Sequence, residues 1–305
     1  MSFEVIKSGL RFPEGPIWRP NGDLVLVEIE AGRLSRVSKH GEITTIADLG
    51  GGPNGAAIGP DGACYVCNNG GFTWLQNDGL LFPEGTPDNY TGGSIQRVDL
   101  ITGEFETLYT ECDGVRLAGP NDIVFDRSGG FWFTDTGKLF PRTTIRGGIY
   151  YAQPDGSSIR EVIFPREFPN GIALSPNEDR LYFAETMNGR LWSYPLSGPG
   201  QIEGDIIPGN PENLLQAPGG IRGFDSMCVD GGGNVCQATL FEGGVSVVSP
   251  DGSLIEFVKF LDPLVTNICF GGEDFKSAYI TLSATGQLIR MPWPREGHRL
   301  NFWDY

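Results

Sequence analysis

The stretch that starts at Pro169 reads Pro169-Asn170-Gly171-Ile172-Ala173-Leu174-Ser175-Pro176-Asn177-Glu178-Asp179-Arg180-Leu181-Tyr182-Phe183. Its first part is apolar, its middle is rich in turn-forming residues, and its end is aromatic. Apolar runs bounded by such polar clusters are typical of strands that are joined by tight turns. The stretch therefore predicts two paired strands, with Asn170 at the start of the first strand.

The same pattern recurs along the whole chain. Each copy begins with an amide or acidic residue, which we call the lead residue, and a turn and a second apolar run follow it. Repeats of about 40 to 67 residues with several short strands each are typical of a β-propeller. We therefore predict an all-β, six-bladed β-propeller with about four strands per blade. The lead residues are Glu14, Asn54, Asn121, Asn170, Asp225 and Asn267.

One domain is expected over residues 1–305, because six similar units that close on one axis form a single domain of this size. Residues 3–6 alternate like a short strand before the first lead residue, whereas the last unit supplies only three strand-like runs. We expect the N-terminal strand to become the outermost strand of the last blade. That pairing would close the ring and remove an open edge.

The charge balance excludes some classes of partner. The chain has 22 Lys and Arg against 38 Asp and Glu, which gives a net charge of −16, and no basic stripe is interleaved with aromatic residues. Such a protein repels phosphate backbones, so we expect no nucleic-acid partner. The sequence shows neither a signal-peptide pattern nor 18 consecutive apolar residues, and most cysteines lie in or beside apolar strands. These features predict a cytoplasmic protein with reduced thiols and no membrane association.

Three segments are longer than a hairpin connection needs, namely residues 72–93, 136–148 and 197–224. Long loops in a compact domain are usually functional or mobile. The first segment carries several aromatic side chains, which either line a pocket or pack inside the protein. We include Phe72 and Trp74 among the candidate substrate-binding residues.

The lead residues form a candidate metal site. The first strand of each propeller blade lines the central axis, so we expect the six side chains to converge at one end of the channel. Two carboxylates crowded among amides repel each other unless a proton or a cation lies between them. Oxygen ligands favour Ca²⁺, Mg²⁺ or Mn²⁺. The alternative is that each lead residue only caps a strand through hydrogen bonds to the backbone.

The chain has few of the residues that other catalytic chemistries require. The sequence contains two histidines, His40 and His298, which leaves almost nothing for a histidine-based zinc site or a Ser–His–Asp triad. Cys64 and Cys67 are three residues apart and would face opposite sides of a strand, so core packing is the better interpretation of this pair.

Several motifs give the chain a specific resemblance. Along nearly its whole length it resembles the SMP-30/gluconolactonase/LRE family of six-bladed lactonases and, more distantly, diisopropyl fluorophosphatase. The motifs are Pro13-Glu14-Gly15-Pro16, Pro120-Asn121-Asp122 with Phe131-Trp132-Phe133-Thr134-Asp135, Pro169-Asn170-Gly171-Ile172-Ala173 with Leu181-Tyr182, Phe224-Asp225 with Gly233-Asn234, and Thr266-Asn267-Ile268-Cys269-Phe270-Gly271-Gly272.

The resemblance implies a ligand set. A divalent cation, with Ca²⁺ favoured over Mg²⁺, Mn²⁺ or Zn²⁺, would be held by Glu14, Asn170 and Asp225, with Asn121 beside it or among its ligands. Asp225 would also be the catalytic base or nucleophile. Gly119 stands where family members that bind sugar lactones often carry an arginine, which weakens the case for a gluconate-type substrate.

From their places in the ring, Asn54, Asn121 and Asn267 are further candidates for contact with the substrate. The leading hypothesis is a metal-dependent hydrolase that opens a small-molecule lactone. The cation would polarise the carbonyl, and Asp225 or a metal-bound hydroxide would drive the attack of water. Two alternatives stay open: phosphotriester or fluorophosphate hydrolysis at the same site, and a non-catalytic propeller with a structural calcium ion. The sequence does not indicate the oligomeric state.

Overall fold

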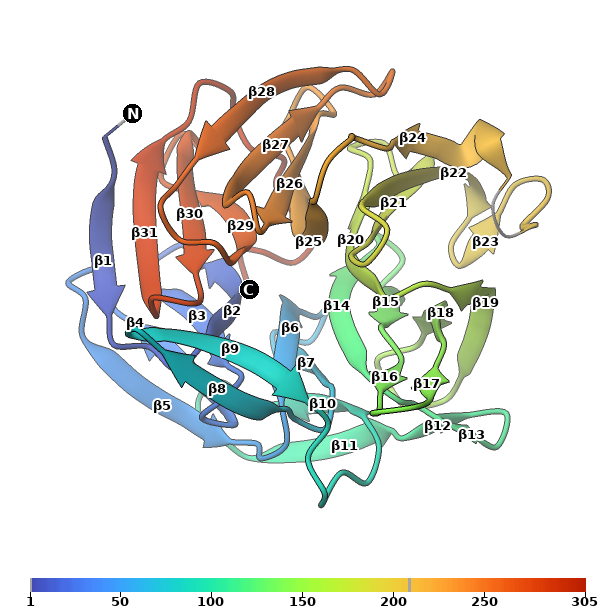
Figure 1. The fold of residues 1–305 in the computed structure, drawn as a ribbon, viewed down its shortest axis with the longest axis horizontal. Coiled ribbons are helices and arrows are strands. Elements are labelled where there is room, and N and C mark those ends of the chain that lie inside the picture. The colour runs from blue at the N-terminus through green and yellow to red at the C-terminus, as the bar shows by residue number, and fades with distance from the viewer. Residues whose placement is uncertain (1, 208–209) are drawn as a thin grey trace.

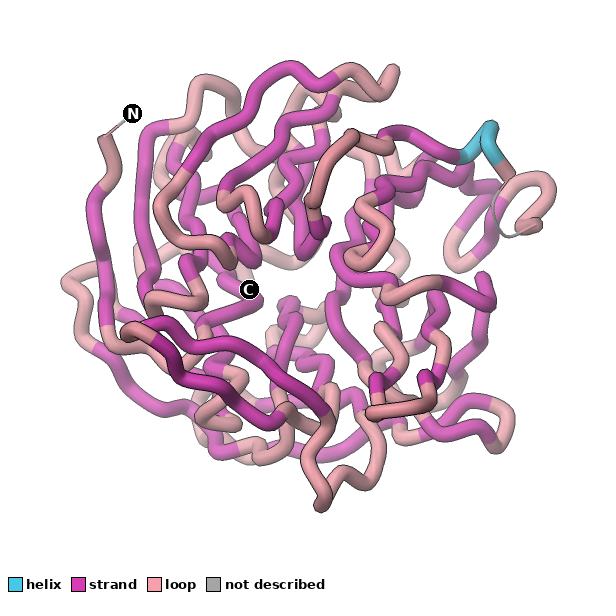
Figure 2. Tube along the Cα trace, viewed as in Figure 1, coloured by secondary structure: helices cyan, strands magenta, loops and turns pink. Residues whose placement is uncertain are grey.

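The computed structural model describes residues 2–207 and 210–305, and strands make up most of its regular structure (Figure 2). Five four-stranded sheets and one five-stranded sheet stand around a central axis (Figure 1). This arrangement confirms the predicted all-β, six-bladed propeller. Within the described residues, no helix is long and apolar enough to cross a membrane.

Each blade begins with its innermost strand. Blade 1 contains β2 (Pro13–Trp18), β3 (Leu24–Glu28), β4 (Arg33–Val37) and β5 (Ile43–Asp48). Blade 2 contains β6 (Pro53–Ile58), β7 (Cys64–Asn68), β10 (Ser94–Val98) and β11 (Phe105–Tyr109). Blade 3 contains β14 (Pro120–Phe125), β15 (Phe131–Asp135), β18 (Gly147–Ala152) and β19 (Ile159–Arg166).

The remaining blades follow the same order. Blade 4 contains β20 (Pro169–Leu174), β21 (Arg180–Glu185), β22 (Arg190–Gly198) and β24 (Leu214–Gln216), with β23 (Gln201–Ile202) beside β22. Blade 5 contains β25 (Gly223–Val229), β26 (Val235–Leu240), β27 (Gly244–Val248) and β28 (Leu254–Lys259). Blade 6 contains β29 (Val265–Gly271), β30 (Ser277–Leu282), β31 (Gln287–Pro292) and β1 (Glu4–Ser8).

The N-terminal strand closes the ring as the sequence predicted. Strand β1 pairs antiparallel with β31, and Glu4 lies opposite Arg290. The last blade is therefore completed by the first strand of the chain. Because β1 supplies the outer strand, blade 6 reaches the same four-stranded size as most of the other blades.

Two of the three long segments form hairpins between the second and third strands of their blades. Hairpin β8 (Thr73–Asn77) and β9 (Leu80–Gly85) belongs to blade 2, and hairpin β16 (Lys138–Leu139) and β17 (Thr144–Ile145) belongs to blade 3. Figure 1 shows both on the viewer's side of the ring. The third segment contains β23 and the short 3-10 helix η1 (Pro211–Asn213). Another hairpin, β12 (Glu111–Cys112) and β13 (Val115–Arg116), precedes blade 3.

The apolar core lies between neighbouring blades. For example, Tyr65 of blade 2 and Phe131 of blade 3 are buried in one cluster, with ring centroids 5.9 Å apart. In blades 1, 2 and 4 the inner strand approaches the next blade so closely that glycine is needed after the lead residue. A methyl group on Gly171 would lie 2.4 Å from the carbonyl oxygen of Asp225 in the next blade. All six cysteines are buried and free, including Cys112.

The residues that follow β31 cross the end of the channel opposite the long hairpins. Trp303 stacks on Trp18 of blade 1, with ring centroids 5.9 Å apart. The side-chain amide of Asn301 donates a hydrogen bond of 3.0 Å to the carbonyl oxygen of Phe125 in blade 3. Leu300 and Trp303 line a second, smaller cavity with the far ends of the inner strands. This end of the channel is therefore covered by the chain itself.

Candidate active site

A β-bulge lies beside each lead residue. In blade 4, Pro169 pairs with Glu185 and Ile172 pairs with Phe183, so Asn170 and its neighbour share one partner position on β21. Register shifts occur at the corresponding place in the other five inner strands. Bulges redirect side chains and are frequent next to active sites. In this protein the bulges occur where the side chains of the lead residues point toward the central axis.

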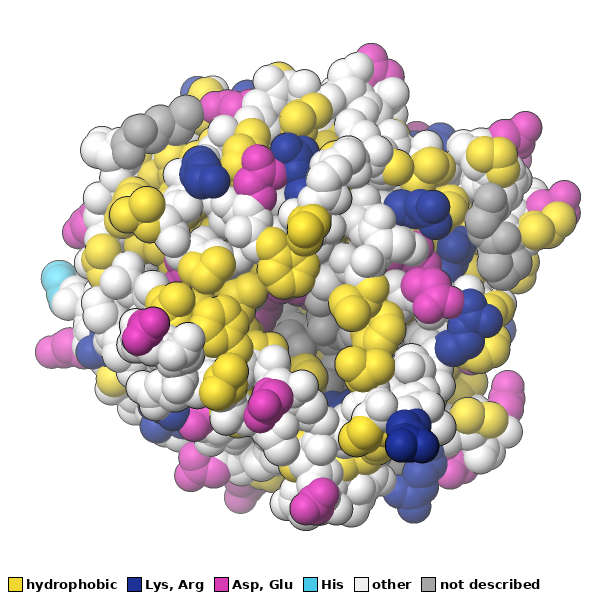
Figure 3. Space-filling view, viewed as in Figure 1, with side chains coloured by type: hydrophobic (Ala, Val, Ile, Leu, Met, Phe, Trp, Pro, Cys, Tyr) yellow, Lys and Arg dark blue, Asp and Glu magenta, His cyan; other side chains and the backbone are white. Residues whose placement is uncertain are grey.

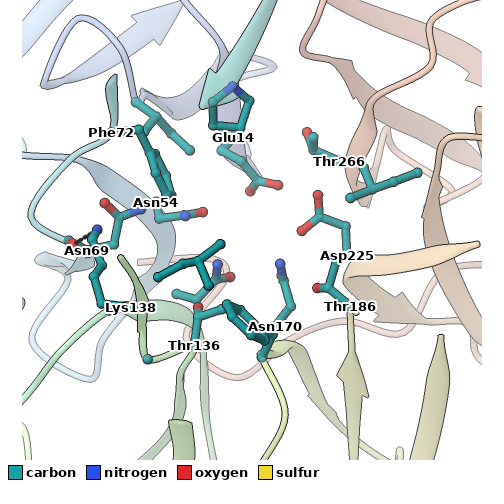
Figure 4. A pocket seen from close by; sticks show the side chains of 18 of the residues that line it. Glu14, Asn54, Asn69, Phe72, Thr136, Lys138, Asn170, Thr186, Asp225 and Thr266 are labelled. Atoms are coloured by element: carbon teal, nitrogen blue, oxygen red, sulfur yellow. Dashed lines mark hydrogen bonds between the residues drawn. The ribbon is translucent and has the colours of Figure 1, made fainter. Parts of the chain in front are cut away.

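Five of the six lead residues line one cavity of about 280 Å³ at the hairpin end of the channel, namely Glu14, Asn54, Asn121, Asn170 and Asp225. All five are less than one-tenth exposed. Figure 4 shows the carboxylates of Glu14 and Asp225 pointing toward each other, with Asn54 and Asn170 directed into the same space. The structure thus brings together residues that lie up to 211 positions apart in the chain.

Asn267 does not line this cavity, contrary to the expectation from the sequence. Val265 pairs with Leu282 and Asn267 pairs with Thr281, so the extra residue of the bulge in blade 6 is Thr266. Thr266 lines the cavity in place of Asn267. Asn267 instead donates a hydrogen bond from Nδ2 to Glu14 Oε2 over 2.7 Å. It supports the ring from behind and has no place in the cavity wall.

Of the two aromatic residues predicted to bind substrate, Phe72 and Trp74, only one lies at the cavity. Phe72 lines the cavity, whereas Trp74 is not among the lining residues. The Trp74 ring packs against Phe12 at a centroid distance of 5.0 Å and against Phe72 at 5.8 Å. Trp74 therefore buttresses the wall of the cavity without forming its surface.

The carboxylates of Glu14 and Asp225 are buried close together, which disfavours their charged forms. Burial raises the pKa of Glu14 to about 7, although hydrogen bonds from Asn267 and the Gly15 backbone oppose the shift. Burial, followed by the negative charge of Glu14, raises the pKa of Asp225 well above its ordinary value. Two buried acids in one site are stabilised in their charged forms only by a nearby positive charge or by further hydrogen bonds.

Two buried oxygens of the ring have no hydrogen-bond partner among the described residues. They are Glu14 Oε1 and Asn121 Oδ1. Buried acceptors without a partner cost free energy, so their presence in a native site requires an explanation. Among the described residues no group of three His, Cys, Asp or Glu side chains gathers as a metal cluster. A cation in the ring would therefore be bound by two carboxylates and by amide oxygens, a set of hard donors that suits Ca²⁺.

The chain matches a known protein family. The family described as SMP-30/Gluconolactonase/LRE-like region matches residues 12–284. The chain belongs to this family. Its relatives include the gluconolactonase of Zymomonas mobilis, which is 27% identical over 94% of this chain and 80% of the relative. They also include the diisopropyl-fluorophosphatase of Loligo vulgaris, which is 29% identical over 94% of this chain and 90% of the relative.

A solved structure of the calcium-binding protein regucalcin from Agrobacterium tumefaciens has the same fold as this family member. The two structures have a TM-score of 0.74 at 19% sequence identity, and the match covers 100% of this chain and 98% of the other. The likeness extends through all six blades, because it leaves no part of the chain uncovered.

In this family member, Asp122 forms part of a second layer that the sequence reasoning did not single out. Asp122 follows the lead residue of blade 3, where blade 4 has Gly171, and its carboxylate accepts a hydrogen bond of 3.1 Å from the Ile172 backbone. Burial, followed by the negative charge of Glu14, raises the pKa of Asp122 to about 8. The signal was available in the repeat, because an acidic residue stands where blades 1, 2 and 4 have glycine.

Lys138 is another cavity residue that the repeat could not reveal, because β16 belongs to an insertion. The side chain is 3% exposed. Its Nζ donates hydrogen bonds to the carbonyl oxygens of Asn69 at 2.6 Å and Gly71 at 2.8 Å, and lies 4.6 Å from the centre of the Phe72 ring. Figure 4 shows Lys138 and Asn69 side by side in the wall. Lys138 thereby ties the blade 3 insertion to the loop that carries Phe72.

Proposed function

We propose that this family member is a metal-dependent lactonase, which opens a cyclic ester by adding water to its carbonyl carbon. The observation that carries the proposal is the pair of buried, unpaired oxygens, Glu14 Oε1 and Asn121 Oδ1, in a cavity shared with Asn170 and Asp225. The relationship to a gluconolactonase supports the reaction class. The expected substrate is a small molecule, because the cavity measures about 280 Å³.

The residues that would hold the cation are Glu14, Asn121, Asn170 and Asp225. Carboxylate and amide oxygens without nitrogen or sulfur ligands favour Ca²⁺, and the relationship in fold to a calcium-binding protein supports that choice. When bound, a divalent cation polarises an ester carbonyl and stabilises the negative charge that develops on its oxygen.

The chain itself would handle the proton. The Asp225 carboxylate accepts a proton from the attacking water while the water oxygen bonds to the carbonyl carbon. The bond between that carbon and the ring oxygen then breaks, and the same proton passes to the ring oxygen as it becomes a hydroxyl group. The amides of Asn54 and Asn170, which line the cavity, would orient the ester, and the buried floor would keep bulk water away from it.

Hydrolysis of fluorophosphates is the second candidate. The diisopropyl-fluorophosphatase of Loligo vulgaris covers as much of this chain as the gluconolactonase does, at 29% identity. A phosphoryl oxygen is a hard acceptor like an ester carbonyl oxygen, so the same ring of ligands could serve either reaction.

A paired assay tests the proposal. The purified protein is incubated with δ-valerolactone or with a fluorophosphate after treatment with EGTA, after restoration of CaCl₂, and with calcium-loaded EGTA as the matched control. We expect lactone hydrolysis to disappear on chelation and to return with calcium. Turnover of the fluorophosphate alone would favour the second candidate. A rise in unfolding temperature with calcium, without turnover of either compound, would mean a non-catalytic propeller with a structural ion.

A further inference from the structure

Above its polar floor the cavity is surrounded by apolar side chains, with at least one from each blade. We take one large side chain from each blade and call these six the apolar collar, namely Phe12, Phe72, Leu139, Phe168, Leu240 and Leu264. Phe12, Phe168 and Leu264 precede inner strands. Phe72 and Leu139 follow second strands, and Leu240 is the last residue of the second strand β26. Figure 3 shows hydrophobic side chains gathered around the central hollow of this face.

Three polar side chains in the wall are already hydrogen-bonded to the chain's own carbonyl groups. Thr86 Oγ1 donates to the carbonyl oxygen of Leu139 at 2.6 Å, and Thr186 Oγ1 donates to that of Phe224 at 2.7 Å. Lys138 donates to two backbone carbonyl oxygens in the same way. A ligand that carries several hydroxyl groups needs a partner for each buried group. The donors of these three side chains are therefore not free for such a ligand.

Asn69 differs from these three side chains. Its side chain is 2% exposed, its Oδ1 accepts a hydrogen bond of 2.8 Å from the Gly71 backbone, and its Nδ2 is buried without a partner. An unpaired donor calls for an acceptor oxygen on the ligand. The wall is thus suited to a ligand with one acceptor beside the ester and an otherwise apolar body.

We infer that the substrate is a lactone with an alkyl or aryl substituent, which the apolar collar binds, and that polyhydroxylated sugar lactones are poorer substrates. The inference rests on the proposed lactonase activity and specifies its substrate class. Burying apolar surface strengthens binding, and each methylene group fully buried in the collar raises kcat/KM by up to about fourfold.

The test uses three lactones with the same six-membered ring: δ-valerolactone, δ-decalactone and glucono-δ-lactone. Rates of acid release are measured with calcium present and corrected for spontaneous opening. We expect kcat/KM for δ-decalactone to exceed that for δ-valerolactone by at least about tenfold, with glucono-δ-lactone below both. A preference for glucono-δ-lactone, or equal rates on the first two compounds, overturns the inference.

A pair of variants links the preference to the collar. Leu139 and Leu254 are both 45% exposed, but only Leu139 lies at the cavity, whereas Leu254 is on the outer strand β28. Leu139→Ser should lower the ratio of kcat/KM for δ-decalactone to that for δ-valerolactone by about threefold or more, and Leu254→Ser should leave the ratio unchanged. An unchanged ratio in Leu139→Ser would show that the collar does not bind the alkyl substituent of the lactone.

Direct binding separates failure of the inference from failure of the proposed function. Calorimetry with the ring-opened acids 5-hydroxydecanoate, 5-hydroxypentanoate and gluconate does not require turnover. If no lactone is hydrolysed but 5-hydroxydecanoate binds most tightly, the lactonase proposal fails while the apolar preference of the cavity stands. If lactones are hydrolysed and gluconate binds most tightly, the lactonase proposal stands and the inference fails.

Discussion

Asn267 Nδ2 donates a hydrogen bond of 2.7 Å to Oε2 of Glu14, and this bond joins the inner strands of the last and first blades. It occupies one oxygen of the Glu14 carboxylate, whereas Oε1 has no hydrogen-bond partner within residues 2–207 and 210–305. Groups that orient metal ligands from behind typically change metal affinity 10- to 100-fold when they are removed. Asn267 is therefore a positioning residue for the proposed cation site.

Replacing Asn267 with alanine should weaken calcium binding by about tenfold or more, because the Glu14 carboxylate loses the donor that holds it. Calorimetric titration of the chelator-treated protein with CaCl₂ measures this directly. The matched control is Asn234→Ala, which removes an amide-to-carboxylate bond of similar length to Asp230 at the far end of blade 5. Equal calcium affinities in the two variants would exclude the positioning role.

Gly171→Ala should destabilise the protein, because the added methyl group would lie 2.4 Å from the Asp225 carbonyl oxygen. Forcing an extra methyl group into a tightly packed site costs about 1–3 kcal/mol, which corresponds to a fall of several degrees in unfolding temperature. Gly198→Ala, on β22 of the same blade, is the control, because a methyl group there meets no atom of the described part of the chain within 4 Å. Thermal unfolding followed by circular dichroism should show a loss only for the first variant. Identical curves would refute the close approach.

Lys138 predicts a specific dependence of stability on pH. Burial lowers the pKa of Lys138 to about 8, although the negative charge of Asp135 opposes the shift, whereas the pKa of an unfolded lysine is about 10.4. Between these values the unfolded chain binds more protons than the folded protein, so stability contributed by this group rises with pH from about 8 to 10.4 and is lost as pH falls through that window.

Comparing the wild type with Lys138→Met isolates this effect, because the other titrating groups are common to both proteins. Urea unfolding at pH 7.5, 8.5 and 9.5 should show the free energy of unfolding of the wild type increasing relative to the variant, by on the order of 1–2 kcal/mol across the series. A constant difference at all three values would mean that the Lys138 pKa is close to that of an exposed lysine.

The repeat was sufficient to predict the six blades, because each unit must bury its strands against neighbours and therefore repeats the same alternation of apolar runs and turns. It also predicted five members of the ring, since equivalent positions of the inner strands converge on the axis. The sixth was misplaced by one residue. Asn267 was aligned by its amide, whereas the bulge of β29 places Thr266 in the position of Asn170. The apolar residue that follows each pair, Ile172 or Ile268, would have given the correct register.

Side chains outside the repeat could not be placed in this way. Lys138 and Phe72 come from segments that occur once in the chain, so no equivalent position indicates where they point. Trp74 lies two residues after Phe72 and was assigned the same role, but it packs behind the wall against Phe12. The direction of such side chains depends on contacts between different blades, which sequence spacing does not specify.

The most direct test of the central claim is the rate at which Asp225→Ala hydrolyses δ-valerolactone in saturating CaCl₂, with circular dichroism confirming that the variant is folded. Because Asp225 is proposed both to hold the cation and to accept the proton from water, removing it should lower kcat/KM by at least about a thousandfold. Wild-type hydrolysis by the folded variant would contradict the assignment of the ring as the catalytic site.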